Sequence, residues 1–240
     1  MNAKLIVLGS SSSGNSYILD VGDEILLIEC GVDKKTLLRG LNYDLARVTA
    51  CISTHKHKDH VNPQTVKYLL SSGIKVYSNA DVNSIHPSVR IIEPMKKYTI
   101  GGFNVIALPV EHNVECYAYL IDHPDMGRLV FYTDTRSFNF KIPHVNFVLG
   151  EVNYSDDIIL DNLCNGYDVR SQYNNHMSLD TAISVIRRLY SHELSKVICC
   201  HLSTSNADIS EIKRRFQSEL GISVECATTG VFFELKSCEF

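Results

Sequence analysis

The densest group of reactive side chains lies in the stretch CISTHKHKDH, residues 51–60. His55, His57, Asp59 and His60 are spaced there at i, i+2, i+4 and i+5. A helix brings i, i+3 and i+4 onto one face, so this spacing does not suit a helix. At a strand end, His55 and His57 point the same way, and a following turn brings Asp59 and His60 to a neighbouring point. Imidazole nitrogens with carboxylate oxygens suit zinc, manganese or iron better than magnesium or calcium.

The residues around this motif indicate that it connects a strand to a helix. The apolar residues before it lead us to expect a strand over 48–53. After it, Asn62 is a suitable helix N-cap and Pro63 a suitable first residue of a helix over 63–71. A solvated turn has no need of three histidines and an aspartate, so we favour a metal site. Other parts of the chain must then supply the remaining ligands.

The missing ligands are expected where other strands end, because strands place side chains accurately and loops leave room for a substrate. Three residues meet this condition, each lying just behind a predicted strand: His112, Asp134 and His201. A single histidine at a strand end is more often a surface residue, but the cluster at 55–60 changes that expectation. Together the two sets give seven candidate ligands, enough for two ions that share one carboxylate.

Size and charge limit the other classes of function. The chain has 240 residues, 45% of them hydrophobic, which is enough for a large core, and we expect a single domain over 1–240. Its formal net charge is −4, so no bulk positive charge attracts nucleic acid or an anionic membrane, and phosphate binding must be local. Lys56 and Lys58 flank the ligands and would either attract a phosphate backbone or face solvent.

The N-terminal segment and the cysteines indicate the compartment. Only a short apolar run precedes a Ser/Gly stretch, and it is too short for a signal peptide or a membrane span. The eight cysteines form no CxxC pair, and several lie in apolar runs, so we expect buried reduced thiols. We therefore expect a cytoplasmic protein with no membrane partner.

Short strands dominate the first two-thirds of the chain, and helices alternate with strands near its end. The predicted strands cover 4–8, 17–19, 25–28, 48–53, 75–77, 97–100, 103–110, 116–122, 128–133, 145–149, 196–200, 223–226 and 231–235. The predicted helices cover 33–41, 63–71, 81–84, 179–190 and 207–220. This order predicts helices packed outside two sheets, a layered α/β sandwich.

Two segments are interpreted as connections. Residues 9–15, GSSSSGN, lack the lysine of a P-loop and precede no helical pattern, so we interpret them as a loop between strands at the rim of the site. Residues 153–175 are expected to form a long polar connection.

The seven ligands, in this order and at strand ends, resemble the metallo-β-lactamase superfamily. The resemblance covers nearly the whole chain, because residues 9–16 resemble the family's early Ser/Gly loop, and Glu29, Cys30 and Gly31 stand where many members have Asp, any residue, Gly. It implies a four-layer αββα sandwich with the metal site at one edge of the two sheets. It also implies that His55, His57 and His112 hold a first ion and that Asp59, His60 and His201 hold a second. Asp134 would bridge the two ions.

The shared core fixes the metal site but not the substrate, because members include β-lactamases, thioester hydrolases, diiron oxygen reductases and nucleases. The diiron reductases have Glu where this chain has His57, and exported β-lactamases have Cys where it has Asp134. The segments around Glu151 and His176 resemble those of nuclease branches, including the tRNA 3′-processing type and the short YycJ or WalJ exonucleases. Residues 201–206, HLSTSN, resemble the closing segment of that short family.

The resemblance therefore implies a metal-dependent hydrolase of phosphodiester bonds, similar to an exonuclease, with DNA or RNA as substrate. Its cofactors would be two divalent ions, zinc, manganese or iron, that hold the attacking hydroxide. Asp59 or Asp134 would orient the nucleophile. Glu151 would fix the tautomer of His176 and raise its pKa, so that His176 protonates the leaving oxygen. Two alternatives stay open: a small-molecule hydrolase (thioesterase, lactonase or cyclic phosphodiesterase) with the same ligands, and a metal-binding protein without catalysis.

Overall fold

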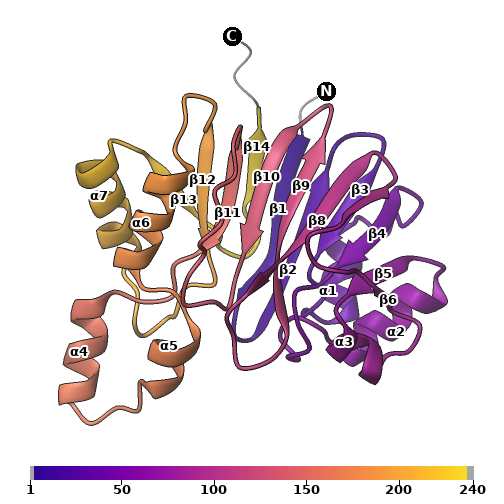
Figure 1. The fold of residues 1–240 in the computed structure, drawn as a ribbon. Helices are drawn as coiled ribbons and strands as arrows, with labels where there is room; N and C mark the ends of the chain where they lie inside the picture. The colour runs from indigo at the N-terminus through magenta and orange to yellow at the C-terminus, as the bar shows by residue number, and fades with distance from the viewer. Residues whose placement is uncertain (1–2, 237–240) are drawn as a thin grey trace.

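Two facing β-sheets form the centre of the protein in a computed structural model that describes residues 3–236 (Figure 1). The first sheet contains, in spatial order, β14 (Phe232–Leu235), β1 (Ala3–Ser11), β2 (Gly14–Asp20), β3 (Ile25–Ile28), β4 (Val48–Ile52), β5 (Lys75–Ser78) and β6 (Arg90–Ile91). The second contains β13 (Val224–Cys226), β12 (Lys196–Cys200), β11 (Phe147–Glu151), β10 (Gly127–Tyr132), β9 (Cys116–His123), β8 (Phe103–Val110) and β7 (Lys97–Ile100).

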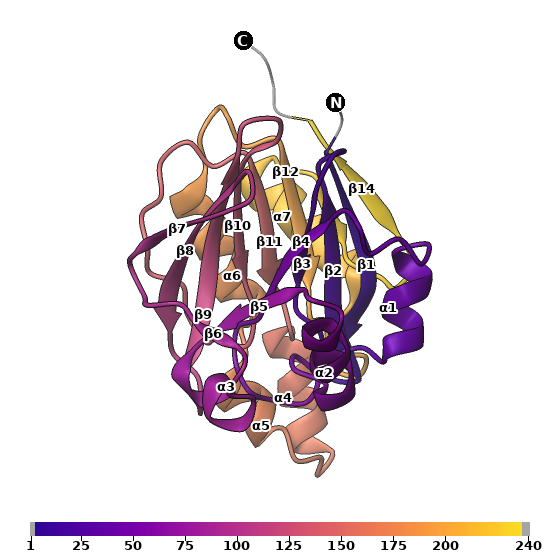
Figure 2. The same ribbon diagram turned by 90° about the vertical axis from the view of Figure 1, so that its right-hand side faces the viewer.

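Helices cover the outer faces of both sheets (Figures 1 and 2). The helices on the side of the first sheet are α1 (Lys34–Gly40), α2 (Pro63–Ser71) and α3 (Ala80–Ile85). Those on the second sheet are α6 (Leu179–Leu189) and α7 (Ile209–Leu220). A further pair, α4 (Asp156–Cys164) and α5 (Arg170–Asn175), projects from the end of the second sheet beyond α6, as Figure 1 shows.

Three apolar clusters separate the four layers. Leu5 and Phe131 belong to the cluster between the two sheets, and Ile186 and Phe216 to the cluster between the second sheet and its helices. A third cluster, which includes Leu69, fills the space between the first sheet and α1 and α2. Burial of these side chains away from water is the main force that holds the layers together. The predicted αββα sandwich is confirmed.

The two sheets share one pairing pattern. In each, three antiparallel pairings are followed by three parallel ones: β3, β4, β5 and β6 are parallel neighbours in the first sheet, and β10, β11, β12 and β13 in the second. Parallel strands end at the same edge, and both sets end toward the lower side in Figure 1. Residues that follow these strands are therefore collected at one edge of the sandwich.

Two of the predicted connections are wrong. Residues 9–15 continue β1 and β2 as a hairpin in which Ser11 pairs with Gly14, so only the tip at Ser12 and Ser13 is a turn. Residues 153–175 contain α4 and α5, which bury few residues and therefore show no apolar period in the sequence. The short strand β6 was also not predicted. The strand predicted at 145–149 lies two residues later, so Glu151 is its last residue.

The cysteines agree with the expectation of reduced thiols. Within residues 3–236 every cysteine is free, and all except Cys164 are buried; Cys238 lies outside the described residues. In the same range, none of the helices combines the length and apolar character that a membrane crossing needs.

A carboxylate joins the two sheets at the end opposite to the parallel strand ends. Glu24, in the turn before β3, accepts hydrogen bonds from the Gly102 backbone N–H at 2.8 Å and from Thr49 Oγ1 at 2.9 Å. The Nε2 atom of His123, at the end of β9, lies 3.2 Å from the same carboxylate. Because Gly102 and His123 belong to the second sheet, Glu24 holds the sandwich closed at this end.

Replacing Glu24 by alanine should lower the free energy of unfolding by about 1–3 kcal/mol, because the Gly102 N–H, the Thr49 hydroxyl and the buried His123 ring lose the acceptor that they share. Urea unfolding of the chelator-treated protein measures this change. The control is Glu225→Ala, which removes an exposed ion pair with Lys196 within the second sheet and should cost about 1 kcal/mol or less. Equal losses in the two variants would show that Glu24 does not hold the sheets together.

Candidate metal centre

The motif at 55–60 occupies the loop between β4 and α2, as predicted. Asn62 caps α2 through its side-chain oxygen, and Pro63 is the first residue of the helix. Before the helix begins, the chain bends back to the first sheet, where Val61 forms an isolated bridge with Cys30 just beyond β3. The loop is therefore fixed at both ends by regular structure.

The Ser/Gly hairpin supports the second half of this loop. The backbone N–H of Asn15 donates to the Asp59 carbonyl at 2.7 Å, and the Asn15 carbonyl accepts from the Gly31 N–H at 2.9 Å. A Cβ atom at Gly31 would overlap the Asp59 carbonyl, so only glycine permits this approach. The side-chain amide of Asn15 lies 3.0 Å from His60 Nε2. Sequence reasoning placed this hairpin at the rim but missed the contact of Asn15 with the site.

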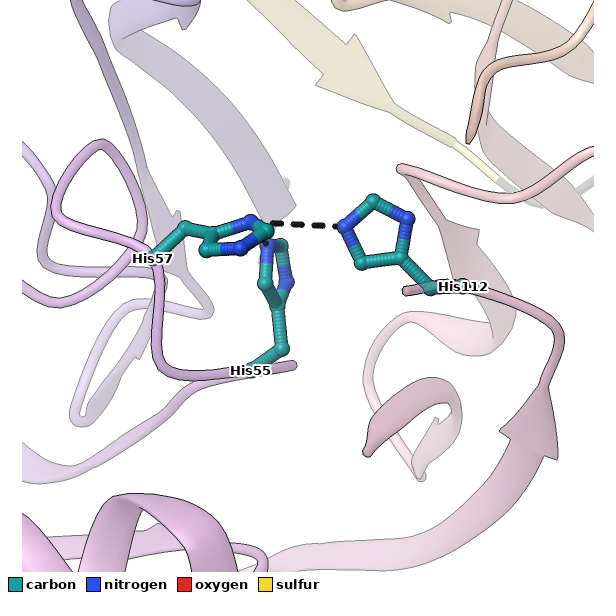
Figure 3. Close-up of side chains that lie close together, drawn as sticks. All are labelled: His55, His57 and His112. Carbon is teal, nitrogen blue, oxygen red and sulfur yellow. Dashed lines mark hydrogen bonds between the residues drawn. The ribbon is translucent and has the colours of Figure 1, made fainter. Parts of the chain in front are cut away.

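Three imidazole rings form a first group of candidate ligands. His55 Nε2 lies 2.9 Å from His57 Nδ1, which lies 3.3 Å from His112 Nε2. Figure 3 shows His55 and His57 on one segment facing His112 on another. Ligands bound tetrahedrally to zinc at about 2.0–2.1 Å are about 3.3 Å apart. Both distances between the rings are close to this value, and all three nitrogens lie within 4.8 Å of one another, so the three rings can hold one ion.

Asp59, His60 and His201 form a second group. The Oδ2 atom of Asp59 lies 3.3 Å from His60 Nε2 and 3.8 Å from His201 Nε2. The two histidines are buried, whereas the Asp59 side chain keeps 25% of its surface exposed. Asp59 is therefore the most exposed member of this group.

Asp134 lies between the two groups. Its Oδ2 atom is 2.6 Å from His60 Nε2 and 3.9 Å from His55 Nε2, and these two histidines belong to different groups. The structure therefore brings all seven predicted ligands together, with Asp134 where a shared ligand is needed. How they divide between ions stays a prediction.

The backbone at the strand ends is unusual. Glu29, Asp134 and His201 each lie one or two residues beyond a parallel strand, with φ of 64°, 48° and 53°. Few residues other than glycine adopt this left-handed region, and such conformations cluster at functional sites. Here they turn side chains from both sheets toward one point.

The donor atoms fit a divalent metal ion. His201 Nε2 is buried and has no hydrogen-bond partner among the described residues, although it faces Asp59. A buried polar atom without a partner is costly and calls for a missing ligand. Imidazole nitrogens with carboxylate oxygens form a set that zinc, manganese and iron accept.

The protonation of these groups follows from burial and from their neighbours. Burial lowers the pKa of His55 and His112. Burial also acts against protonation of His201, but the carboxylates of Asp134, Asp59 and Glu151 outweigh it and raise the pKa of His201 to about 9. Burial would raise the pKa of Asp134, yet His201 and His60 hold it well below its ordinary value. Without metal, His201 therefore retains a proton at neutral pH, whereas His55 and His112 are neutral.

Glu151 and His176 lie together beside the ligands, as predicted. His176 Nδ1 lies 2.7 Å from Glu151 Oε1 and 3.1 Å from Asp134 Oδ1. Burial disfavours the imidazolium, but the Glu151 carboxylate outweighs this and raises the pKa of His176 to about 10. Glu151 is fully buried; it also lies 3.1 Å from His201 Nδ1 and accepts the backbone N–H of Thr135. The sequence did not reveal this second role, in which Glu151 orients a ligand.

Glu29 is a further member of the site to which sequence reasoning gave no role. It is fully buried, accepts hydrogen bonds from Ser53 Oγ and Thr54 Oγ1, and lies 3.3 Å from His60 Nδ1. Thr54 Oγ1 in turn lies 2.8 Å from His55 Nδ1. Glu29 thus lies beside His60 and reaches His55 through Thr54, and both Nε2 atoms face the cluster. The signal in the sequence was a carboxylate directly after the apolar strand ILLI.

The groups open into a cleft of about 500 Å³. Asp59, His112, Asp134, His176 and His201 line its floor. Neither lysine of the motif is among its lining residues, and Lys56 Nζ instead pairs with Asp81 at 2.7 Å. The expectation that these lysines attract a phosphate backbone therefore has no support in the geometry.

The known proteins whose sequences are similar to this chain include nucleases. No family model matches the chain. It is 24% identical to exodeoxyribonuclease WalJ of Streptococcus pneumoniae serotype 2, over 92% of this chain and 91% of that protein. It is also 27% identical to ribonuclease Z of Clostridium kluyveri, over 40% of this chain and 39% of that protein. The resemblance to these nuclease branches is thereby confirmed.

Solved structures give the fold. The metallo-β-lactamase fold protein YhfI from Bacillus subtilis superimposes with a TM-score of 0.76 and 20% sequence identity, over 98% of this chain and 100% of that one. The layers, the pairing pattern and the ligands at the shared strand edge agree with this likeness. The chain therefore has the metallo-β-lactamase fold, with a candidate metal-binding cluster at the edge where its parallel strands end.

Proposed function

We propose that this protein is a metal-dependent phosphodiesterase that degrades nucleic acid, with an exonuclease-like action. The observation that carries the proposal is His176, an imidazole at the cleft that is not needed as a ligand and is held by the buried Glu151. Hydrolysis of a nucleic acid must expel a poorly acidic sugar hydroxyl, so a proton donor at this place is useful. The similarity to an exodeoxyribonuclease over nearly the full chain supports the same substrate class.

The seven candidate ligands would hold two divalent ions, of which zinc and manganese suit the donor set best. Such ions would supply an activated water and would neutralise charge on the phosphate. We assign His55, His57 and His112 to one ion and Asp59, His60 and His201 to the other, with Asp134 shared.

The remaining chemistry belongs to the side chains of the chain itself. Asp59 is the partly exposed carboxylate at the cleft and would orient the attacking water. His176 directs Nδ1 to Glu151, so its Nε2 is left for the substrate. With its pKa raised by Glu151, the ring keeps a proton at neutral pH and donates it from Nε2 to the leaving oxygen.

The first test combines metal content with cleavage of single- and double-stranded DNA and RNA in zinc or manganese. His57→Ala should lose about one equivalent of metal by mass spectrometry, and cleavage should fall at least about a hundredfold. The control is His144→Ala, an exposed histidine paired with Glu193, which should match the wild type. If the metal-loaded wild type cleaves no polynucleotide but cleaves thioesters, the proposal is refuted in favour of a small-molecule hydrolase.

The second test isolates the proton donor. His176→Ala should keep its metal but cleave an oligonucleotide about 10²–10⁴-fold more slowly. The loss should be much smaller on bis(p-nitrophenyl) phosphate, whose acidic leaving group departs without a proton. Glu151→Gln should move the alkaline limb of the pH–rate profile to lower pH, because the raised pKa of His176 depends on this carboxylate. Equal losses on both substrates would exclude His176 as the acid.

Metal uptake should release protons. His201 has a pKa of about 9 in the metal-free protein, and the pKa of His60 also lies well above its ordinary value, because Asp134 and Glu29 outweigh the effect of burial. Both rings must be neutral to bind metal, so affinity should rise with pH up to about 9. Calorimetry of zinc binding near pH 7.5, in buffers of different ionisation enthalpy, should give about one to two protons released. Uptake without proton release would show that these rings are not ligands.

A further inference from the structure

A second hollow of about 390 Å³ adjoins the cleft beyond the candidate ligands. The two spaces share one wall, formed by Ser11 of the β1–β2 hairpin and by Leu202, Ser203 and Thr204 behind β12. The far side of the hollow is lined by Ser10, Ala207, Ile209, Ala227, Thr228 and Thr229. A chain-like substrate at the candidate ligands can therefore cross this wall and remain in contact with the protein.

The second hollow suits a sugar–phosphate chain in charge and in hydrogen bonding. Its lining residues include no carboxylate, although the whole chain has a net charge of −4. The hydroxyls of Thr204, Thr228 and Thr229 are exposed, and no hydrogen bond to another described residue occupies them. Ser10 differs, because its Oγ accepts the His201 backbone N–H and bonds the Tyr17 hydroxyl. The free threonine hydroxyls are groups that proteins use to hold phosphate and sugar oxygens.

A rival path from the cleft leads over α5 to the groove between α4 and α5. That groove is lined mainly by apolar side chains, including Leu160 and Tyr173, and it also contains Asp156 and Arg170, whose guanidinium pairs with Asp168 at 2.7 Å. Burial raises the pKa of Asp156, and the carboxylates of Asp180 and Asp157 raise it further, whereas a hydrogen bond from Ser178 and the charge of Arg215 lower it. The groove therefore offers a phosphate chain mainly apolar side chains, a carboxylate, and a guanidinium that is already paired with Asp168.

We infer that the hollow between the Ser/Gly hairpin, residues 202–209 and residues 227–229 binds the sugar–phosphate chain of the substrate next to the cleaved nucleotide. The inference rests on the proposed function and narrows its substrate class to strands of several nucleotides. Hydroxyl contacts to phosphate and sugar carry no base information, so binding there is independent of base sequence. The Ser/Gly hairpin thereby gains a function in addition to its support of Asp59.

The test measures kcat/KM for a thymidine dinucleotide and a thymidine hexanucleotide, and uses their ratio. The wild type should prefer the hexanucleotide, and Thr228→Val with Thr229→Val should reduce this preference about tenfold through two lost hydrogen bonds. The comparison cancels effects on the chemical step, because both substrates have the same leaving group.

Two variants serve as controls. Thr99→Val makes the same chemical change on the distant strand β7, and Tyr173→Ala alters the rival groove; both should keep the wild-type preference. A preference that survives in the double variant, or that is lost in Tyr173→Ala, overturns the inference. A wild type that cleaves both substrates equally well also overturns it and leaves the proposed function standing. A wild type that cleaves no polynucleotide refutes both.

Discussion

Three carboxylates, Glu29, Asp134 and Glu151, are buried at one edge of the sandwich, and within residues 3–236 none of them pairs with a lysine or arginine. Burying such charge without compensation is expensive. In the metal-free protein the compensation comes from protons, which is why the pKa values of His176 and His201 are raised. Divalent cations supply the same compensation without protons. Affinity for a cation therefore follows from the way the edge is built.

This charge can be concentrated because of the way the strands pair. The parallel strands of both sheets end at the same edge, and residues that directly follow them come from distant parts of the chain. Left-handed backbone at Glu29, Asp134 and His201 then turns the chain so that these side chains meet. The strained positions are tolerated because the sheets and three apolar clusters fix the strands. Stability of the layers is thus a condition for the geometry of the site.

The parts of the site that could be predicted are those marked by a pattern of neighbouring residues in the sequence. The motif at 55–60 is contiguous, and each isolated ligand follows an apolar run that marks a strand, so the strand-end argument could find them. Glu29 also follows an apolar run, but its role was missed because its contacts with Thr54 and His60 exist only once β3 pairs with β4. In the same way, α4 and α5 were missed because within α4 only Ile159 is buried and within α5 no residue is. Hydrophobic periodicity and the spacing of motif residues cannot identify positions that depend only on tertiary contacts.

The two outer carboxylates have parallel roles. Glu29 connects His55, through Thr54, to His60, and Glu151 connects His176 to His201. In the first pair both rings are candidate ligands, so Glu29 sets the relative position of the two groups. In the second pair only one ring is a candidate ligand, so Glu151 couples the ligand shell to the proposed proton donor. A change at Glu151 must therefore affect ligand orientation and the proposed proton donor together, whereas a change at Glu29 affects the candidate ligands and the pKa of His60 but not the proposed donor. Each of the two carboxylates lies between two imidazoles. Glu29 supports only candidate ligands, whereas Glu151 also supports the proposed proton donor.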